Sequence, residues 1–225
     1  MKLLSIIIPV LNEAETLPRL KHQLRAFFHP AVEIIVVDGG SNDASATLAG
    51  EFAHRVVTSP AGRAKQMNAG AAVATGAMLL FLHADTVLPA ASRQRLLMLA
   101  QSGQALWGRF DVRLSGRHRL FRVIEGMMNL RSRLTGVATG DQAIFVHRRL
   151  FAQVGGYPDI PLMEDIALSK RLRALYRPVC LRLPVVTSSR RWETYGIVRT
   201  VMLMWWLRLL YFLGVSPHRL KQWYA

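Results

Sequence analysis

Three short apolar runs constrain the fold of this chain more than any other feature of its sequence. They cover residues 3–8, 33–38 and 78–83, and the first is interrupted only by Ser5. Runs of this length that are apolar on both faces are typical of strands buried in a parallel sheet. Patterns with helical spacing follow them, at residues 15–28, from about residue 43, and at 65–74. Alternation of strands and helices predicts an α/β fold, with a mostly parallel central sheet flanked by helices.

The second half of the chain has a different character. The first half also contains a short predicted strand at 55–58, whereas in the second half a strand at 105–112 suggests an antiparallel or mixed extension of the sheet. Residues 113–133 contain six arginines among apolar residues, a pattern that predicts a basic amphipathic helix or a mobile loop. Further strands are predicted at 143–147 and 179–183, and a helix at 165–175. No linker divides the chain, so its 225 residues predict one domain.

The net charge of +15 favours anionic partners, such as nucleic acid, anionic lipid or phosphorylated small molecules. Charge alone does not choose among them. A lone cysteine, Cys180, excludes an internal disulfide framework, and no secretory signal precedes the first strand. A reducing, cytoplasmic compartment is therefore expected.

Acidic residues are few, and half of them follow predicted strands or lie in loops. The carboxyl ends of parallel strands share one edge of a sheet, so Glu13, Asp38 and Asp85 are expected to converge on one ligand. There, Asp38 could accept a hydrogen bond from a nucleotide base beside Gly39, and Asp85 could hold a divalent cation against a diphosphate. Each acid taken singly could instead serve a turn or a helix cap, and Ser41 is a candidate cap for the helix from residue 43.

Residues 197–215 are almost wholly apolar, but Arg199 and Arg208 interrupt them. Two arginines make a membrane span costly. An amphipathic helix in the membrane interface fits better, because Trp205 and Trp206 suit the headgroup boundary. A core helix or an oligomer interface is the alternative.

Several motifs occur in one order along the chain. They are IIIPVLNE at 6–13, IIVVDGGSND at 34–43, KQMNAG at 65–70, HAD at 83–85, GDQ at 140–142 and MED at 163–165. Together they resemble family 2 glycosyltransferases over residues 3–192. This resemblance implies a GT-A fold, with residues 1–100 as the nucleotide-binding half and 101–195 as the acceptor half. Residues 196–225 would form a helical tail that contacts membrane or a second copy.

The resemblance also implies site residues. The nucleotide sugar would be bound by Pro9, Leu11, Glu13, Asp38, Gly39, Arg63, Lys65, His83 and Ala84. Asp85 would bind Mn²⁺ or Mg²⁺. Asp165 would act as the general base, next to Glu164, and the acceptor or the diphosphate would contact Asp141, Gln142, Arg190, Arg191 and Trp192.

One position departs from the family pattern, because His83 replaces the first acid of its Asp-x-Asp motif. A neutral imidazole could still bind a ribose or Mn²⁺, or could simply pack at the strand end. It adds no negative charge, so the metal affinity is expected to be lower or differently tuned.

The activity implied by the resemblance is metal-assisted transfer of one sugar, with inversion, from a nucleotide-diphosphate sugar. A UDP-sugar is favoured as donor. Ser188 stands where processive members have the Gln of a Gln-x-x-Arg-Trp element, so addition of a single sugar is expected. The chain is most similar to a small bacterial subfamily associated by name with arsenosugar biosynthesis. The acceptor, either lipid-linked or a small molecule, stays open, as does homo-oligomerisation, and peripheral attachment to the inner face of the cell membrane is expected.

Other classes of protein fit less well. A nicotinamide dehydrogenase would need Gly-x-Gly-x-x-Gly after the first strand, and this motif is absent, as is the phosphate-binding loop Gly-x-x-x-x-Gly-Lys-Ser/Thr. A nucleotidyltransferase would share the sheet and the metal-binding acid. The chain could also be a basic module that binds membrane or nucleic acid and derives from an inactive transferase. The acids that follow the predicted strands would then have no role, so nucleic acid is a disfavoured partner.

Overall fold

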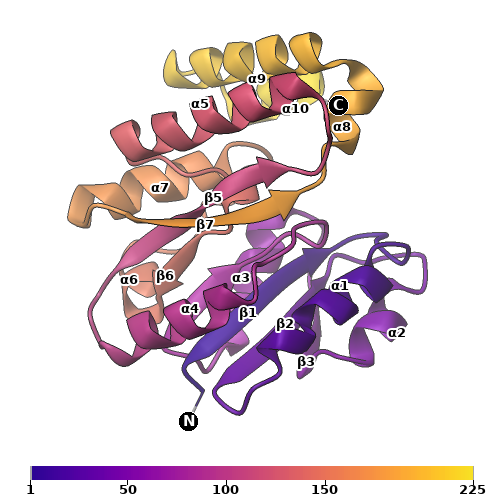
Figure 1. Ribbon diagram of the computed structural model, residues 1–225, viewed down its shortest axis with the longest axis vertical. Helices are drawn as coiled ribbons and strands as arrows, with labels where there is room; N and C mark the ends of the chain where they lie inside the picture. The colour runs from indigo at the N-terminus through magenta and orange to yellow at the C-terminus, as the bar shows by residue number, and fades with distance from the viewer. Residues whose placement is uncertain (1, 225) are drawn as a thin grey trace.

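The computed structural model describes residues 2–224 and contains a seven-stranded sheet in the order β3-β2-β1-β4-β6-β5-β7 (Figure 1). Every neighbouring pair is parallel except the two pairs formed by β6. The strands are β1 (Leu4–Val10), β2 (Val32–Asp38), β3 (Arg55–Thr58), β4 (Met78–Phe81), β5 (Trp107–Leu114), β6 (Phe145–His147) and β7 (Val179–Thr187). The prediction of a mostly parallel central sheet is confirmed.

Helices cover both faces of this sheet. The α-helices are α1 (Leu17–Leu24), α2 (Ser45–Gly50), α3 (Arg63–Val73), α4 (Ala91–Gln101), α5 (Arg119–Thr135), α6 (Arg148–Gln153), α7 (Glu164–Leu175), α8 (Arg190–Tyr195), α9 (Ile197–Phe212) and α10 (Pro217–Tyr224). Two 3-10 turns, η1 (Arg25–Phe27) and η2 (Gly140–Gln142), complete the elements.

Alternation along β1 shows how the two faces are filled. Ile6 and Ile8 pack in one cluster with α1 and α4, whereas Ile7 packs in another with α3 and α7. Successive side chains of a strand point to opposite faces, so a fully apolar strand is buried on both sides. On the second face, α3 lies so close to β1 that a Cβ on Gly70 would be 2.4 Å from Cγ2 of Ile7.

The predicted strands all occur, and the second half is the mixed extension that was expected, because β5 is parallel to β7 and antiparallel to β6. Residues 113–133 are mostly helix α5 and not a mobile loop. Three helices, α4, α6 and α8, were not predicted. In α4 the apolar residues 96–99 are consecutive, so they lack the spacing that marks an amphipathic helix.

The prediction that Ser41 caps α2 is wrong. Ser41 instead donates its hydroxyl to Oδ1 of Asp38 at 2.5 Å, within the turn that follows β2. Ala44 is the N-cap residue of α2, and just before it Oδ1 of Asp43 accepts the amide of Ser45 at 2.9 Å. A carboxylate two residues before the amide therefore satisfies the start of this short helix.

The C-terminal helices form a layer beyond β5 and β7, where α5, α9 and α10 lie near one another (Figure 1). Leu207 of α9 and Leu220 of α10 are fully buried against Met163 and Ile166, at the start of α7. The predicted helical tail is thus confirmed as α9 and α10. Within residues 2–224, none of the helices combines the length and the apolarity needed to cross a bilayer.

Candidate functional site

A cavity of about 810 Å³ opens at the carboxyl ends of β1 and β4, and we call it the strand-end cavity. The first turns of α3 and α7 and one side of α10 complete its wall. It is lined by Pro9, Val10, Leu11, Glu13, Ala61, Gly62, Arg63, Ala64, Lys65, Gln66, His83, Ala84, Asp85, Asp159, Ile160, Pro161, Leu162, Glu164, His218, Lys221 and Tyr224. Its volume lies in the range of cavities that enclose a small ligand.

The start of α3 gives this cavity an anion-binding character. Gly62 precedes the helix with φ of 137°, a conformation that suits glycine, and no side chain caps the first amides. Arg63 and Lys65 follow at once and line the cavity. Uncapped amides and the helix dipole favour an anion here, and the two cations add to that preference.

Asp85 places a carboxylate at the opening of the same cavity. Its side chain is exposed, and its Oδ1 accepts only a long hydrogen bond of 3.3 Å, from the hydroxyl of Thr86. Mg²⁺ and Mn²⁺ accept carboxylate oxygens, and Mg²⁺ often takes only one or two from the protein. No group of three or more acids, histidines or cysteines within residues 2–224 could hold a metal on its own. Asp85 therefore fits a cation whose other oxygens come from a bound phosphate and water.

His83 is neutral at pH 7. Burial, and after it the charge of Arg63, lower its pKa to about 4, although the charges of Asp85 and Asp165 act in the opposite direction. Its ring lies against Gly140, where a Cβ would be 2.6 Å from the imidazole Cε1. Its Nδ1 is 3.8 Å from Oδ1 of Asp141, an acid whose own pKa is raised by burial.

The first two residues of α7 have different surroundings. Glu164 is 7% exposed and lines the strand-end cavity. Burial, with the charge of Asp165 as the second cause, raises the pKa of Glu164 to about 7. The oxygens of Asp165 accept the amides of Gly140 and Ile166, each at 2.7 Å. Asp165 thus joins η2 to the start of α7, and it is not among the residues that line the strand-end cavity.

The structure brings nine of the predicted site residues together in the strand-end cavity. They are Pro9, Leu11, Glu13, Arg63, Lys65, His83, Ala84, Asp85 and Glu164. Asp38 and Gly39 lie next to it, outside the lining. Both oxygens of Asp38 accept hydrogen bonds from the loop 40–41, and a Cβ on Gly39 would be 3.0 Å from Cδ of Gln66. The missing side chain of Gly39 thus leaves room for the side chain of Gln66.

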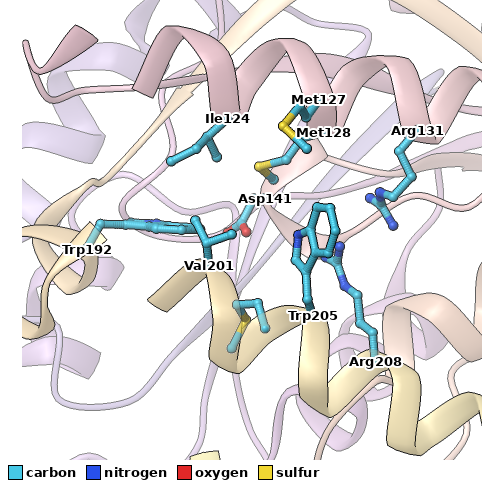
Figure 2. Close-up of a pocket in the computed structure, with 10 residues that line it drawn as sticks. Ile124, Met127, Met128, Arg131, Asp141, Trp192, Val201, Trp205 and Arg208 are labelled. Atoms are coloured by element: carbon cyan, nitrogen blue, oxygen red, sulfur yellow. The ribbon is translucent and has the colours of Figure 1, made fainter. Parts of the chain in front are cut away.

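The predicted residues of the acceptor half are distributed over several places. Asp141 and Trp192 line a second cavity, between α5 and α9 (Figure 2). Arg190 lines a smaller pocket that also contains Asp85. Gln142 is fully buried, and its Oε1 accepts the amide of Thr139. Its role in the structure is to close the η2 turn.

Arg191 holds the last helix over the site. It donates from Nη2 to the carbonyl oxygen of Tyr224 at 2.6 Å, and its guanidinium carbon lies 3.7 Å from the centre of the Tyr224 ring. This contact places α10 against the strand-end cavity, where His218 and Lys221 add two basic side chains. Sequence reasoning missed them, although the basic residues of 218–221 were a signal for an anion near the tail.

Comparison with known proteins identifies the family. Residues 5–152 match the profile described as Glycosyl transferase family 2. This chain belongs to glycosyltransferase family 2. An uncharacterized glycosyltransferase of Mycobacterium tuberculosis (strain H37Rv) is 34% identical over 189 residues, which cover 79% of this chain and 71% of the relative. An undecaprenyl-phosphate 4-deoxy-4-formamido-L-arabinose transferase of Klebsiella pneumoniae is 27% identical, over 97% of this chain and 70% of that protein.

Solved structures share the fold. Staphylococcus aureus TarS 1–349 in complex with UDP-GlcNAc has a TM-score of 0.68 at 17% identity, over 84% of this chain and 58% of TarS. The chain spans less than two thirds of the TarS chains that it matches, between 39% and 65%. Glucosyl-3-phosphoglycerate synthase of M. tuberculosis, in complex with Mn²⁺, UDP and glucosyl-3-phosphoglycerate, has a TM-score of 0.59 at 20% identity, over 81% of this chain and 70% of that one. These likenesses establish the GT-A fold of this chain.

The position of α10 gives a first prediction. We expect Lys221→Ala to weaken UDP binding about two- to tenfold, because it removes one exposed cation from the strand-end cavity. Isothermal titration calorimetry measures this change. Arg219→Ala removes the same charge from the same helix outside the cavity and should bind UDP as the wild type does. Equal losses in the two variants would mean that only the net charge of the chain matters.

A second prediction concerns stability at Glu164. A carboxyl whose folded pKa is raised to about 7 favours folding below the unfolded pKa of about 4.3 and loses that contribution as the pH rises toward 7. We therefore expect Glu164→Gln to be more stable than the wild type at pH 8, by roughly 2–4 kcal/mol, and nearly equal to it at pH 4. Urea unfolding at both pH values measures the difference.

The control for this experiment is Glu51→Gln, which removes an exposed acid that pairs with Lys21 at 2.8 Å. This variant should show no gain at pH 8, because an exposed ion pair contributes little. A gain for Glu164→Gln of the same size at pH 4 and pH 8 would contradict a raised pKa.

Proposed function

We propose that this chain transfers one sugar, with inversion at the anomeric carbon, from a nucleotide-diphosphate sugar to an acceptor hydroxyl or phosphate. The observation that carries the proposal is the strand-end cavity, in which one exposed carboxylate, Asp85, shares a wall with Arg63, Lys65 and the uncapped start of α3. Carboxylate, cations and free amides together match a diphosphate that arrives with a divalent cation.

In this proposal the donor extends along the whole strand-end cavity. Pro9, Leu11 and Glu13, at the end of β1, provide the apolar and polar wall for the nucleoside, and Arg63, Lys65 and Lys221 surround the diphosphate. UDP is the favoured nucleotide, since related folds have been solved with UDP and UDP-GlcNAc, although one is a mannosyltransferase in complex with GDP-Man and Mn²⁺. In this proposal Asp38 and Gly39 hold the loop that borders the base.

A divalent cation, Mn²⁺ or Mg²⁺, would be held by Asp85. When bound, it supplies positive charge that stabilises the departing diphosphate. His83 neither repels this cation nor adds negative charge, because it is neutral at pH 7. Arg63 and Arg190 lie on the two pockets that share Asp85, and they add donors for the negative charge of the leaving group.

The acceptor is proposed to approach from the α7 side. If its nucleophile is a hydroxyl, a carboxylate of the 164–165 pair takes the proton, and direct attack on the anomeric carbon gives inversion. Asp165 is the proposed base and Glu164 its neighbour in the cavity. If the nucleophile is a phosphate, no proton needs to be removed.

The remaining proposals concern the setting of the enzyme. Addition of a single sugar is proposed on the basis of Ser188, and peripheral attachment to the inner face of the membrane on the basis of the exposed aromatic residues of α9. One relative carries in its name an undecaprenyl-phosphate substrate, which supports a lipid-linked acceptor. Homo-oligomerisation through α9, and the link to arsenosugar biosynthesis, stay predictions.

A third prediction tests the donor site. We expect UDP to bind in the presence of Mn²⁺ or Mg²⁺, and to bind at least about tenfold more weakly with chelator or in Asp85→Ala, because the diphosphate then lacks its counter-ion. Calorimetry with UDP, GDP and CDP measures this and identifies the base.

The matched control is Asp159→Ala, which removes an acid from the same cavity that pairs with Lys65 at 3.8 Å. This variant should keep metal-dependent binding. If none of the three nucleotides binds under any condition, the proposed transferase activity is wrong, and a charge-driven binding module derived from an inactive transferase takes its place.

A further inference from the structure

The cavity between α5 and α9 is separate from the strand-end cavity and has a different chemistry. Its volume is about 360 Å³, and most of its wall is apolar, with two arginines and one acid among the lining (Figure 2). The residues that line it are Ile124, Met127, Met128, Arg131, Asp141, Trp192, Val201, Met204, Trp205 and Arg208. We call it the α5–α9 cavity.

Two arginines meet at one end of this cavity. Arg131 comes from α5 and Arg208 from α9, and Figure 2 shows both side chains next to Trp205. Neither forms an ion pair with any residue of 2–224, whereas Arg109 and Arg133 both pair with Asp111. Nε and Nη2 of Arg131 are buried and have no hydrogen-bond partner in the same part of the chain.

Such a pair is unfavourable without an anion. Burial, followed by the charge of Arg208, lowers the pKa of Arg131 to about 10, which still leaves it protonated at pH 7. Both side chains are half-buried, and desolvated cations without ion-pair partners cost free energy and repel each other, although the charge of Asp165, and for Arg208 also that of Asp141, offsets part of this cost. The cavity therefore has a place for a negatively charged group, with five donors available on each guanidinium.

The α5–α9 cavity ends beside the strand-end cavity. Asp141 lines the first cavity, His83 lines the second, and their side chains are 3.8 Å apart. An anion held by Arg131 and Arg208 would thus lie on the acceptor side of a donor bound along β1 and β4. The position suits the second substrate of a transferase.

The outer faces of the same two helices are apolar. On α5, Val123, Leu130 and Leu134 are each more than half exposed, and on α9 the same is true of Met202 and Trp206. Exposed apolar side chains on both helices beside the cavity make an extended apolar surface. A hydrocarbon chain that leaves the cavity would meet this surface and not water.

From this we infer that the α5–α9 cavity binds the acceptor as a lipid phosphate, with its phosphate on Arg131 and Arg208 and its hydrocarbon chain against Ile124, Met128 and Met204. The inference rests on the proposed function, because it names the acceptor class of that reaction. One phosphate oxygen of the lipid forms the bond to the anomeric carbon of the sugar. The bond from that carbon to the donor's diphosphate breaks, and the nucleoside diphosphate leaves with the electron pair.

This step moves no proton, since the attacking phosphate is already ionised. The product is a phosphodiester that joins the lipid to the sugar. The chemistry agrees with the surroundings of Asp165, whose two oxygens already accept the amides of Gly140 and Ile166. In this reaction Asp165 acts as a positioning residue that holds η2 against α7.

Three probes separate the parts of the ligand. We expect farnesyl phosphate to bind the wild-type protein at least about tenfold more tightly than farnesol, which has the same chain without the charge, or than inorganic phosphate, which has the charge without the chain. Calorimetry measures binding. Equal binding of farnesol and farnesyl phosphate would overturn the proposal, and so would tight binding of inorganic phosphate alone.

Variants locate the phosphate. Arg131→Ala and Arg208→Ala should each weaken farnesyl phosphate binding about tenfold or more, because each removes a charge-assisted contact. Arg199 is an exposed arginine of α9 outside the cavity. Arg199→Ala removes the same charge and should leave binding unchanged. Loss in all three variants would overturn the proposal and indicate attraction by net charge.

UDP binding with Mn²⁺, measured on the same samples, distinguishes the two proposals and shows that each variant is folded. If UDP binds and farnesyl phosphate does not, the lipid phosphate is wrong and the transferase proposal stands. If farnesyl phosphate binds and UDP does not, the transferase proposal is wrong. Light scattering gives one more outcome: a dimer that buries α9 and excludes farnesyl phosphate would overturn the inference, because a second copy would then cover the cavity.

Discussion

The hydrogen bond from the amide of Gly140 to the carboxylate of Asp165, at 2.7 Å, holds together two segments of the second half of this molecule. Gly140 belongs to η2, which precedes β6, and Asp165 belongs to the first turn of α7. Gly140 also lies directly against His83, where a side chain would collide with the imidazole ring. One backbone position therefore fixes the end of β4, the turn η2 and the start of α7 relative to one another. Both cavities depend on this junction, since His83 lines one and Asp141 lines the other.

Charge in the site is adjusted by burial. Burial holds His83 neutral and raises the pKa of Glu164 to about 7, so two of the titratable groups in the strand-end cavity carry less charge than they would in water. Arg63, Lys65 and Lys221 keep theirs. Loss of negative charge on Glu164 makes the cavity more positive than its sequence composition implies, whereas a neutral His83 adds no charge, and a bound diphosphate would offset the remaining positive charge. Part of the chain's net charge of +15 is thus located at this edge of the sheet.

The sheet and its acids could be predicted because they follow local rules. Strands such as β1 and β2 are continuous apolar runs, and the carboxyl ends of parallel strands must share an edge, so Glu13 and Asp85 had to come together. The hydrogen-bond partners of Asp38 and Gln142 could not be predicted from the sequence. A motif residue can face its own loop or a ligand, and only the packed structure shows that Asp38 accepts bonds from the loop 40–41 and that Gln142 is buried.

The layer formed by α5, α9 and α10 shows a second limit of prediction from sequence. Residues 113–133 predict a basic amphipathic helix or a mobile loop, and residues 197–215 predict an amphipathic helix in the membrane interface, a core helix or an oligomer interface. Their significance comes from the pairing of α5 with α9, two elements more than 60 residues apart, which no periodicity encodes. Once they face each other, Arg131 and Arg208 share one mostly apolar cavity, and within residues 2–224 neither forms an ion pair with a carboxylate, although Asp141 also lines the cavity.

A fold that needed these arginines only for stability would be expected to neutralise them, as it neutralises Arg109 and Arg133 with Asp111. Half-buried cations without an ion-pair partner favour a ligand that brings the missing charge, and apolar walls favour one that also brings a hydrocarbon chain. A single amphipathic anion satisfies both requirements, whereas a soluble sugar satisfies neither. The composition of this cavity, more than the position of any catalytic acid, therefore points to the kind of acceptor that the enzyme uses.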